Sequence, residues 1–187
     1  GEKVIENRWS KRLGVAQSSI REAISTLIAE GFLERHAGRS ARVILLSQED
    51  IVQIYQFRAV MEGFSARLVA ERKPDLSDLD QLTTDMRAAM ERRNMQAFYD
   101  RDLQFHLLIC EKSGNRYLQE ALRRLLVPLF AFVIIRVRGE YSTPEVWERT
   151  IEQHQVQLGH GDGFVHAVGV LQERVPEQAH KIERARA

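Results

Sequence analysis

The stretch QSSIREAISTLIAEGFLERHAGRSARVI, residues 17–44, decides the fold of the first part of the chain. Its first half carries apolar residues at i, i+3, i+4, i+7 and i+8, which predicts an amphipathic helix that begins near Ser18 or Ser19 as a cap and ends at Gly31. The apolar positions are Ile20, Ala23, Ile24, Leu27 and Ile28. Two short extended runs, residues 32–35 and 41–44, then flank a turn that contains Gly38, which predicts a β-hairpin.

A shorter helix is expected just before this stretch, over residues 6–13. Trp9 and Leu13 lie four residues apart on one helical face, and Gly14 is a natural helix terminator. Two short helices joined by a glycine-containing turn form the helix-turn-helix pattern, and the hairpin would be its wing. The second helix of such a unit enters the major groove of DNA with its N-terminal residues facing base edges.

Candidate DNA-binding residues follow from that geometry. The start of the second helix would face base edges, and the basic residues around it and on the wing would meet phosphates or the minor groove. The predicted DNA-binding residues are Arg12, Gln17, Ser18, Ser19, Arg21, Gly38, Arg39 and Arg42. Residues 1–44 hold eight basic and five acidic side chains, whereas the whole chain has a net charge of only +1. The alternative is that these are ordinary solvated side chains on a helix pair with no nucleic-acid partner.

The remaining composition narrows the class of protein. The chain has 187 residues and 44% hydrophobic residues, enough for one or two folded domains. The single cysteine, Cys110, excludes an internal disulfide and lies in an apolar stretch as a small core residue. No apolar run reaches the length of a membrane span, and no signal peptide opens the sequence. We therefore expect a cytoplasmic protein without a membrane partner.

From residue 46 to 187 the pattern is helical, with almost no strand signal. The expected helices cover residues 47–71, 75–93, 95–112, 117–138, 146–158 and 164–186. Antiparallel helices of these lengths should close around one core. The predicted fold class is mainly α, with a winged helix-turn-helix domain over residues 1–45 and an all-helical domain over residues 46–187.

Two parts of the sequence resemble one known family in its own order. KRLGVAQSSIREAISTLIAEGFLERHAGRSARV, Lys11 to Val43, resembles the winged helix of GntR bacterial regulators. The helical part resembles the effector-binding FCD domain of their FadR subfamily, through Ile54–Glu62, Asp102–His106, Ser113–Asn115 and Glu152–His154. The resemblance implies one more helix before Gly1. Family members usually have arginine where this chain has Gln17, and because arginine prefers guanine and glutamine adenine, the bases that are read should differ.

A candidate metal site lies in the helical part. Asp102 and His106 are four residues apart on one helical face, a spacing that suits two ligands of one metal ion. A pair of this kind can equally be a simple hydrogen-bonded pair. The resemblance adds His154 as a third ligand and implies a divalent metal, zinc, nickel or manganese, that holds the carboxylate of a small organic acid.

The other candidate effector-binding residues are arginines. The fourth metal ligand of the subfamily would fall at Arg174, whose guanidinium could clamp a carboxylate directly. Arg136 interrupts a very apolar helix, so it either faces the pocket or simply ends the buried stretch. Arg58 and Glu62 are expected to form a structural salt bridge at i, i+4, with pocket contact by Arg58 as the lesser alternative.

Together these features predict a regulator and not an enzyme. The expected protein is a homodimer that binds a palindromic operator as a repressor and is released when a small organic acid enters the helical domain. One alternative is a helical-bundle metalloenzyme in which Asp102, His106 and His154 activate water. Another is a purely structural interaction protein.

Overall fold

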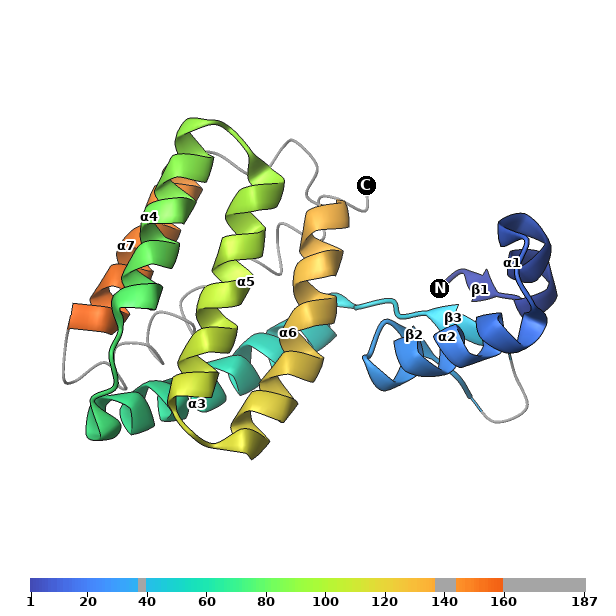
Figure 1. Ribbon diagram of the computed structural model, residues 1–187, viewed down its shortest axis with the longest axis horizontal. Coiled ribbons are helices and arrows are strands. Elements are labelled where there is room, and N and C mark those ends of the chain that lie inside the picture. Colours follow the sequence, from blue (N-terminus) through green and yellow to red (C-terminus); the bar gives the residue numbers. More distant parts are fainter. Residues whose placement is uncertain (37–39, 137–143, 160–187) are drawn as a thin grey trace. The chain divides into compact units, whose positions relative to one another are not determined.

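The computed structural model describes residues 1–36, 40–136 and 144–159. The chain divides into two compact units, Gly1–Ser47 and Gln48–Ala187. The division lies close to the boundary expected after residue 45. Figure 1 shows the elements of each unit, which are described separately here.

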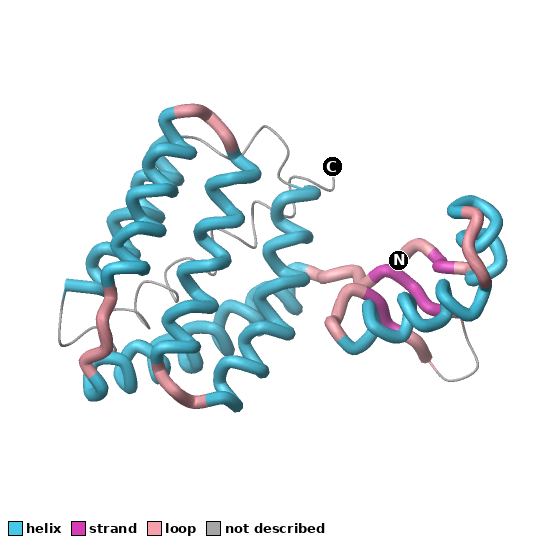
Figure 2. Tube along the Cα trace, in the orientation of Figure 1, coloured by secondary structure: helices cyan, strands magenta, loops and turns pink. Residues whose placement is uncertain are grey.

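The first unit combines two helices with a small antiparallel sheet. Its elements are β1 (Lys3–Val4), α1 (Glu6–Leu13), α2 (Gln17–Ala29), β2 (Leu33–Glu34) and β3 (Ala41–Val43). The strand order is β1-β3-β2, with Lys3 opposite Arg42 and Leu33 opposite Val43. The strands β2 and β3 are the predicted hairpin, and β1 is a third strand that the sequence analysis missed (Figure 2). Two residues are too few for a strand pattern to be recognised.

The turn between α1 and α2 differs in detail from the expectation. Gly14 ends α1 in the left-handed conformation, with φ of +67°, as a glycine C-cap should. Ala16, in an extended conformation, precedes the first residue of α2 and makes no side-chain cap. The prediction that Ser18 or Ser19 caps the helix is therefore wrong, because both lie inside its first turn.

The core of the first unit is narrower than the apolar pattern of α2 suggests. Its buried members are Ile20, Ile24, Leu33 and Ala41, and the partly buried Val4, Trp9 and Ile28 pack against them. Ala23 is exposed and Leu27 is 37% exposed, although the sequence pattern placed both on the apolar face. The buried line of α2 runs through Ile20 and Ile24, with Ile28 partly buried beside them.

The described part of the second unit is a bundle of helices, as the sequence predicts, whereas the helix expected over residues 164–186 lies outside the described residues. Its elements are α3 (Gln48–Arg72), α4 (Ser77–Glu91), α5 (Met95–Lys112), α6 (Arg116–Arg136) and α7 (Pro144–Gly159). α5 packs against α3, α4 and α6, and α7 packs against α4 (Figure 1). Within the described residues, the helices fall short of the length and apolar character needed to cross a membrane.

Large side chains fill the space on both sides of α5. Phe98 stacks on Trp147 of α7 with ring centroids 5.0 Å apart, and Phe105 is also fully buried. On the other side Cys110 packs with Leu122 of α6, in agreement with its expected place in the core. The Asn94 side chain accepts a hydrogen bond from the Ala97 amide over 3.1 Å and so caps the start of α5. These contacts set the position of α5, which carries the polar side chains described next.

Candidate functional site

Three polar side chains meet inside the helical unit. Asp102 and His106 come from α5 and His154 from α7, and their exposed fractions are only 5%, 4% and 2%. The Asp102 Oδ1 atom lies 3.4 Å from His106 Nε2 and 2.7 Å from His154 Nε2. Asp102 and His106 share one face because they are one helical turn apart, whereas His154 reaches them only because α7 packs beside the bundle.

The geometry of this trio fits a divalent metal ion. One ligand atom from each side chain lies within 4.8 Å of the other two. A tetrahedral zinc centre with bonds of about 2.0–2.1 Å separates its ligand atoms by about 3.3 Å, near the 3.4 Å between Asp102 and His106. The 2.7 Å between Asp102 and His154 is a hydrogen-bond distance, so this pair would have to open slightly around an ion.

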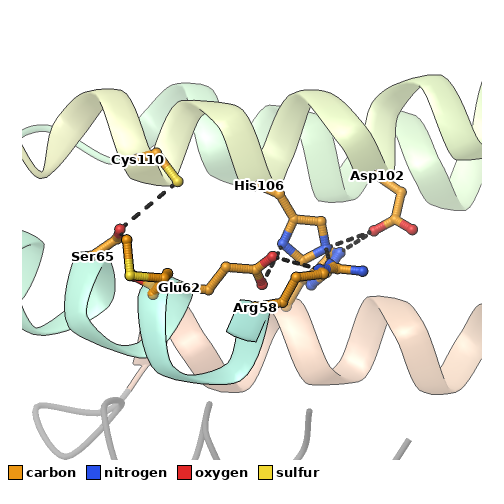
Figure 3. A network of polar contacts seen from close by, with 8 residues as sticks. Arg58, Glu62, Ser65, Asp102, His106 and Cys110 are labelled. Carbon is orange, nitrogen blue, oxygen red and sulfur yellow. Dashed lines mark hydrogen bonds and ion pairs between the residues drawn. The ribbon is translucent and has the colours of Figure 1, made fainter. Parts of the chain in front are cut away.

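Two residues of α3 extend the trio into a larger network, drawn in Figure 3. Arg58 Nε donates to Glu62 Oε1 over 2.8 Å, and the two residues are 3% and 4% exposed. His106 Nδ1 lies 3.1 Å from Glu62 Oε2, and Arg58 Nη2 lies 3.3 Å from His106 Nε2. The expected Arg58–Glu62 salt bridge is present, and it is joined to His106, which the i, i+4 spacing alone did not indicate.

Aromatic rings enclose the network. Phe105 stacks on the His154 ring at 4.1 Å between centroids, and Phe130 lies 5.9 Å from the His106 ring. The Arg58 guanidinium lies 4.9 Å from the centre of the Tyr55 ring and 5.6 Å from that of Phe130. Rings of this kind exclude water, which strengthens every charge interaction among the polar groups they surround.

The ionisation of these groups reflects competition between burial and neighbouring charge. Burial alone would raise the pKa of Glu62, but the charges of Arg58 and His106 outweigh it and lower the pKa to about 2. Burial likewise opposes ionisation of Asp102, and hydrogen bonds from His106 and His154 hold its pKa well below the usual range. For His106 burial favours the neutral ring, but Glu62 and Asp102 raise its pKa. Two carboxylates thus offset the positive charges of Arg58 and His106.

The remaining effector-binding candidates are not described by the structure. Arg136 is the last residue of α6, where the side chains are outside the described part. Arg174 is outside the described residues altogether. Among the three arginines expected to contact an effector, Arg58 is therefore the one whose surroundings are visible.

Those candidate DNA-binding residues that the structure describes are exposed on the first unit, except Arg42, which is partly buried. Gln17, Ser18, Ser19 and Arg21 are all exposed, at the start of α2. Arg12 lies over the Trp9 ring at 5.0 Å, and Arg42 Nη1 donates to the Gly1 carbonyl over 3.0 Å. Gly38 and Arg39 are outside the described residues. The exposed start of α2 agrees with the position that a recognition helix requires.

Similarity to solved structures supports this fold. A transcriptional regulator of the GntR family from Rhodococcus sp. RHA1 aligns with 99% of this chain and 88% of its own, at a TM-score of 0.76 and 18% identity. Escherichia coli McbR/YncC aligns with 96% of this chain and 87% of its own, at a TM-score of 0.74 and 19% identity. At such low identity the likeness concerns the fold alone.

Sequence comparison identifies the family. The chain is 28% identical to the Glc operon transcriptional activator of Escherichia coli K12 over 80% of its length, and 26% identical to the gluconate operon transcriptional repressor of Bacillus licheniformis over 82%. It spans 66% and 64% of the lengths of these relatives, both of which are named as transcription regulators. The FCD domain model matches residues 53–158, more than half of the chain. The chain therefore belongs to the FCD-domain, or FadR-like, subfamily of the GntR regulators.

Proposed function

We propose that this protein is a ligand-responsive transcription regulator that binds operator DNA through its first unit and a small carboxylate through its second. One observation carries the ligand-binding half of this proposal: the trio Asp102, His106 and His154 is buried next to the buried cation Arg58. Burying a polar cluster of this size costs stability unless every group is paired, and such a cost is retained where the cluster serves a function. The family relatives are regulators, which favours this role over that of a metalloenzyme.

The residues for each part of the ligand site follow from their chemistry. Asp102 Oδ1, His106 Nε2 and His154 Nε2 are the donors that would hold a zinc, nickel or manganese ion, and the ion would bind one oxygen of the carboxylate. The Arg58 guanidinium offers parallel N–H groups to the same carboxylate. Glu62 Oε2 lies 3.1 Å from His106 Nδ1 and would accept a hydrogen bond from it, which would keep the other ring nitrogen, Nε2, directed at the ion.

The DNA-binding part of the proposal rests on the exposed start of α2. Gln17, Ser18, Ser19 and Arg21 would face base edges, while Arg12, Arg39 and Arg42 would lie near the phosphates. A homodimer would present two such units to a palindromic operator. The relatives are named as an activator and a repressor. For this chain we propose that effector binding changes the affinity for DNA, a coupling that serves either direction of control.

Metal content tests the ligand site. Protein purified without a histidine tag and without chelator should contain close to one equivalent of a divalent metal per chain by elemental analysis. Asp102→Ala and His106→Ala should each remove it, whereas His36→Ala, at an exposed histidine of the first unit, should not. If wild-type protein contains no metal, the metal site is contradicted. The carboxylate would then have to be bound by arginine alone.

Operator binding tests the DNA-binding part. Fluorescence anisotropy with duplex DNA from upstream of the protein's own operon should show sequence-specific binding at moderate salt. Addition of small organic acids, screened as a panel, should change the affinity for that duplex. Binding that is equally tight to unrelated DNA would contradict the proposal.

A further inference from the structure

Glu6, the first residue of α1, is the centre of a polar cluster on the first unit. Its Oε2 atom accepts a hydrogen bond from Arg21 Nε over 3.1 Å and another from Gln17 Nε2 over 3.4 Å. Its Oε1 atom lies 3.9 Å from Arg35 Nη2. Gln17 and Arg21 are one turn apart on α2, so a single carboxylate from the first helix contacts two successive turns of the second.

The exposures in this cluster differ from those of an ordinary surface ion pair. The Glu6 side chain is only 23% exposed, whereas Arg21 remains 63% exposed. In the nearby pair of Arg8 and Glu2 the two side chains are 66% and 74% exposed and 4.0 Å apart. The Glu6 side chain is thus largely covered by its neighbours. Arg21 is fixed through Nε, while most of its side chain faces solvent.

This arrangement suits base recognition more than general attraction to DNA. An arginine reads guanine through two parallel N–H groups, and a glutamine reads adenine through its amide. Arg21 bonds to Glu6 through Nε, so its two terminal nitrogens belong to the exposed end of the side chain. Prior anchoring reduces the rotamer freedom that the side chain loses when it binds. The negative charge of Glu6 repels DNA phosphates, so it lowers the affinity for DNA of any sequence. By orienting Arg21 and Gln17, the same carboxylate raises the selectivity for the preferred sequence.

We propose that Glu6 is a specificity-determining positioning residue, which orients Arg21 and Gln17 toward the base edges of the operator. The inference rests on the proposed DNA-binding function. Glu6 acts through its two partners on α2, and it makes no base contact of its own. An acidic residue at this position therefore contributes to DNA recognition, although none of the DNA-binding residues predicted from the sequence is acidic.

The first experiment measures sequence selectivity of the whole chain. Wild-type protein selects its preferred sequence from a randomised duplex library, and duplexes with single base-pair changes then compete with that sequence at fixed salt. At the positions that Arg21 and Gln17 read, wild type should discriminate by about tenfold or more, and Glu6→Gln should lose most of this discrimination. Its affinity for unrelated DNA should be equal or higher. Glu2→Gln removes the same charge from an exposed pair and should behave as wild type.

The second experiment observes the contact without DNA. In an NMR spectrum of arginine side chains, the Arg21 Nε–H signal, assigned by its loss in Arg21→Lys, should exchange slowly in wild type and faster in Glu6→Gln. Wild-type protein that selects no sequence would overturn the proposed DNA-binding function and this inference with it. Normal selection by wild type together with unchanged discrimination in Glu6→Gln would overturn the inference alone.

Discussion

Arg58 shows how one buried charge depends on its neighbours. Arg58 is 3% exposed, and its guanidinium donates to Glu62 over 2.8 Å and lies against the rings of Tyr55 and Phe130. A buried ion pair adds little net stability compared with apolar residues, but removing one partner leaves the other charge without compensation. Without Arg58, His106 is the one remaining ion-pair partner of Glu62 among the described residues.

Arg58→Met should therefore lower the free energy of unfolding by about 3 kcal/mol, because it leaves Glu62 buried beside a single cation. Denaturation in urea, followed by circular dichroism, measures the loss. Arg67→Met is the matched control, since Arg67 and Glu71 form an exposed i, i+4 pair on the same helix at 3.6 Å. That variant should lose less than about 1 kcal/mol. Equal losses in the two variants would contradict the dependence on burial.

The Glu62 carboxylate should make stability depend on pH in the acid range. Its pKa is lowered from 4.5 to about 2 in the folded protein, so its contribution is complete above pH 4.5 and is lost as the pH falls toward 2. His106, whose pKa is raised, has the opposite effect: its contribution is complete below its ordinary pKa of 6.5 and is lost as the pH rises through the raised value.

For metal-free protein in EDTA, we expect the free energy of unfolding of wild type to be higher than that of Glu62→Gln. This difference should be largest above pH 4.5. The difference should shrink by about 3 kcal/mol as Glu62 becomes protonated. Urea denaturation at a series of pH values measures it. A difference that stays constant down to pH 3 would show that folding does not lower the pKa of Glu62.

At the scale of the elements, the turn after α5 is built around a glycine. Gly114 has a φ of +66°, and a Cβ atom at this position would collide with the Arg72 guanidinium. Arg72 Nη1 in turn donates to the Ser113 carbonyl over 2.8 Å, which ties the end of α3 to the end of α5. The turn therefore needs glycine for two reasons, its backbone conformation and the space that Arg72 occupies.

A substitution at Gly14 tests the backbone conformation alone, without the loss of space for a neighbouring side chain. Gly14 has a φ of +67° at the end of α1, but a Cβ atom there would meet no atom within 4 Å apart from those of Gly14 and its two chain neighbours. Gly14→Ala should cost about 1–2 kcal/mol for the left-handed backbone alone. Gly114→Ala should cost more, because it also displaces Arg72 from the Ser113 carbonyl. Hydrogen exchange of the peptides around each glycine measures both costs, and equal costs would exclude a role for Arg72.

A second element-scale prediction concerns the start of α5, the helix that carries Asp102 and His106. Asn94→Ala removes the acceptor of the Ala97 amide and should destabilise the helical unit by about 1 kcal/mol. Asn94→Asp retains an oxygen at the same place and should remain close to wild type in urea denaturation. Loss of stability in both variants would show that the cap is not the cause.

At the scale of the whole molecule, the two compact units hold different parts of the proposed function. The exposed start of α2 belongs to the first unit, and the buried network of Arg58, Asp102 and His106 belongs to the second. A ligand that binds only the folded form stabilises the unit that contains its site.

Zinc added to metal-free protein should accordingly slow hydrogen exchange in peptides of α5 and α7. At a free concentration about a hundredfold above its dissociation constant, the gain is about 2.7 kcal/mol. Peptides of α2 should show no such change in the absence of DNA, and His106→Ala should abolish the effect in α5 and α7. Unchanged exchange in α5 and α7 of the wild type would contradict the metal site.

The sequence by itself determined the helices within the described residues, the hairpin strands and the mainly helical fold class, because periodicity, glycine turns and helix ends are local signals. It also indicated Asp102 and His106 as neighbours, since a four-residue spacing places them on one face. Only the tertiary structure decided that Arg58 lies 3.3 Å from His106, 48 residues away in the sequence. The same holds for the contacts of Glu6 with Gln17 and Arg21. Contacts of this kind depend on how helices pack, and packing follows from the shapes of many side chains together.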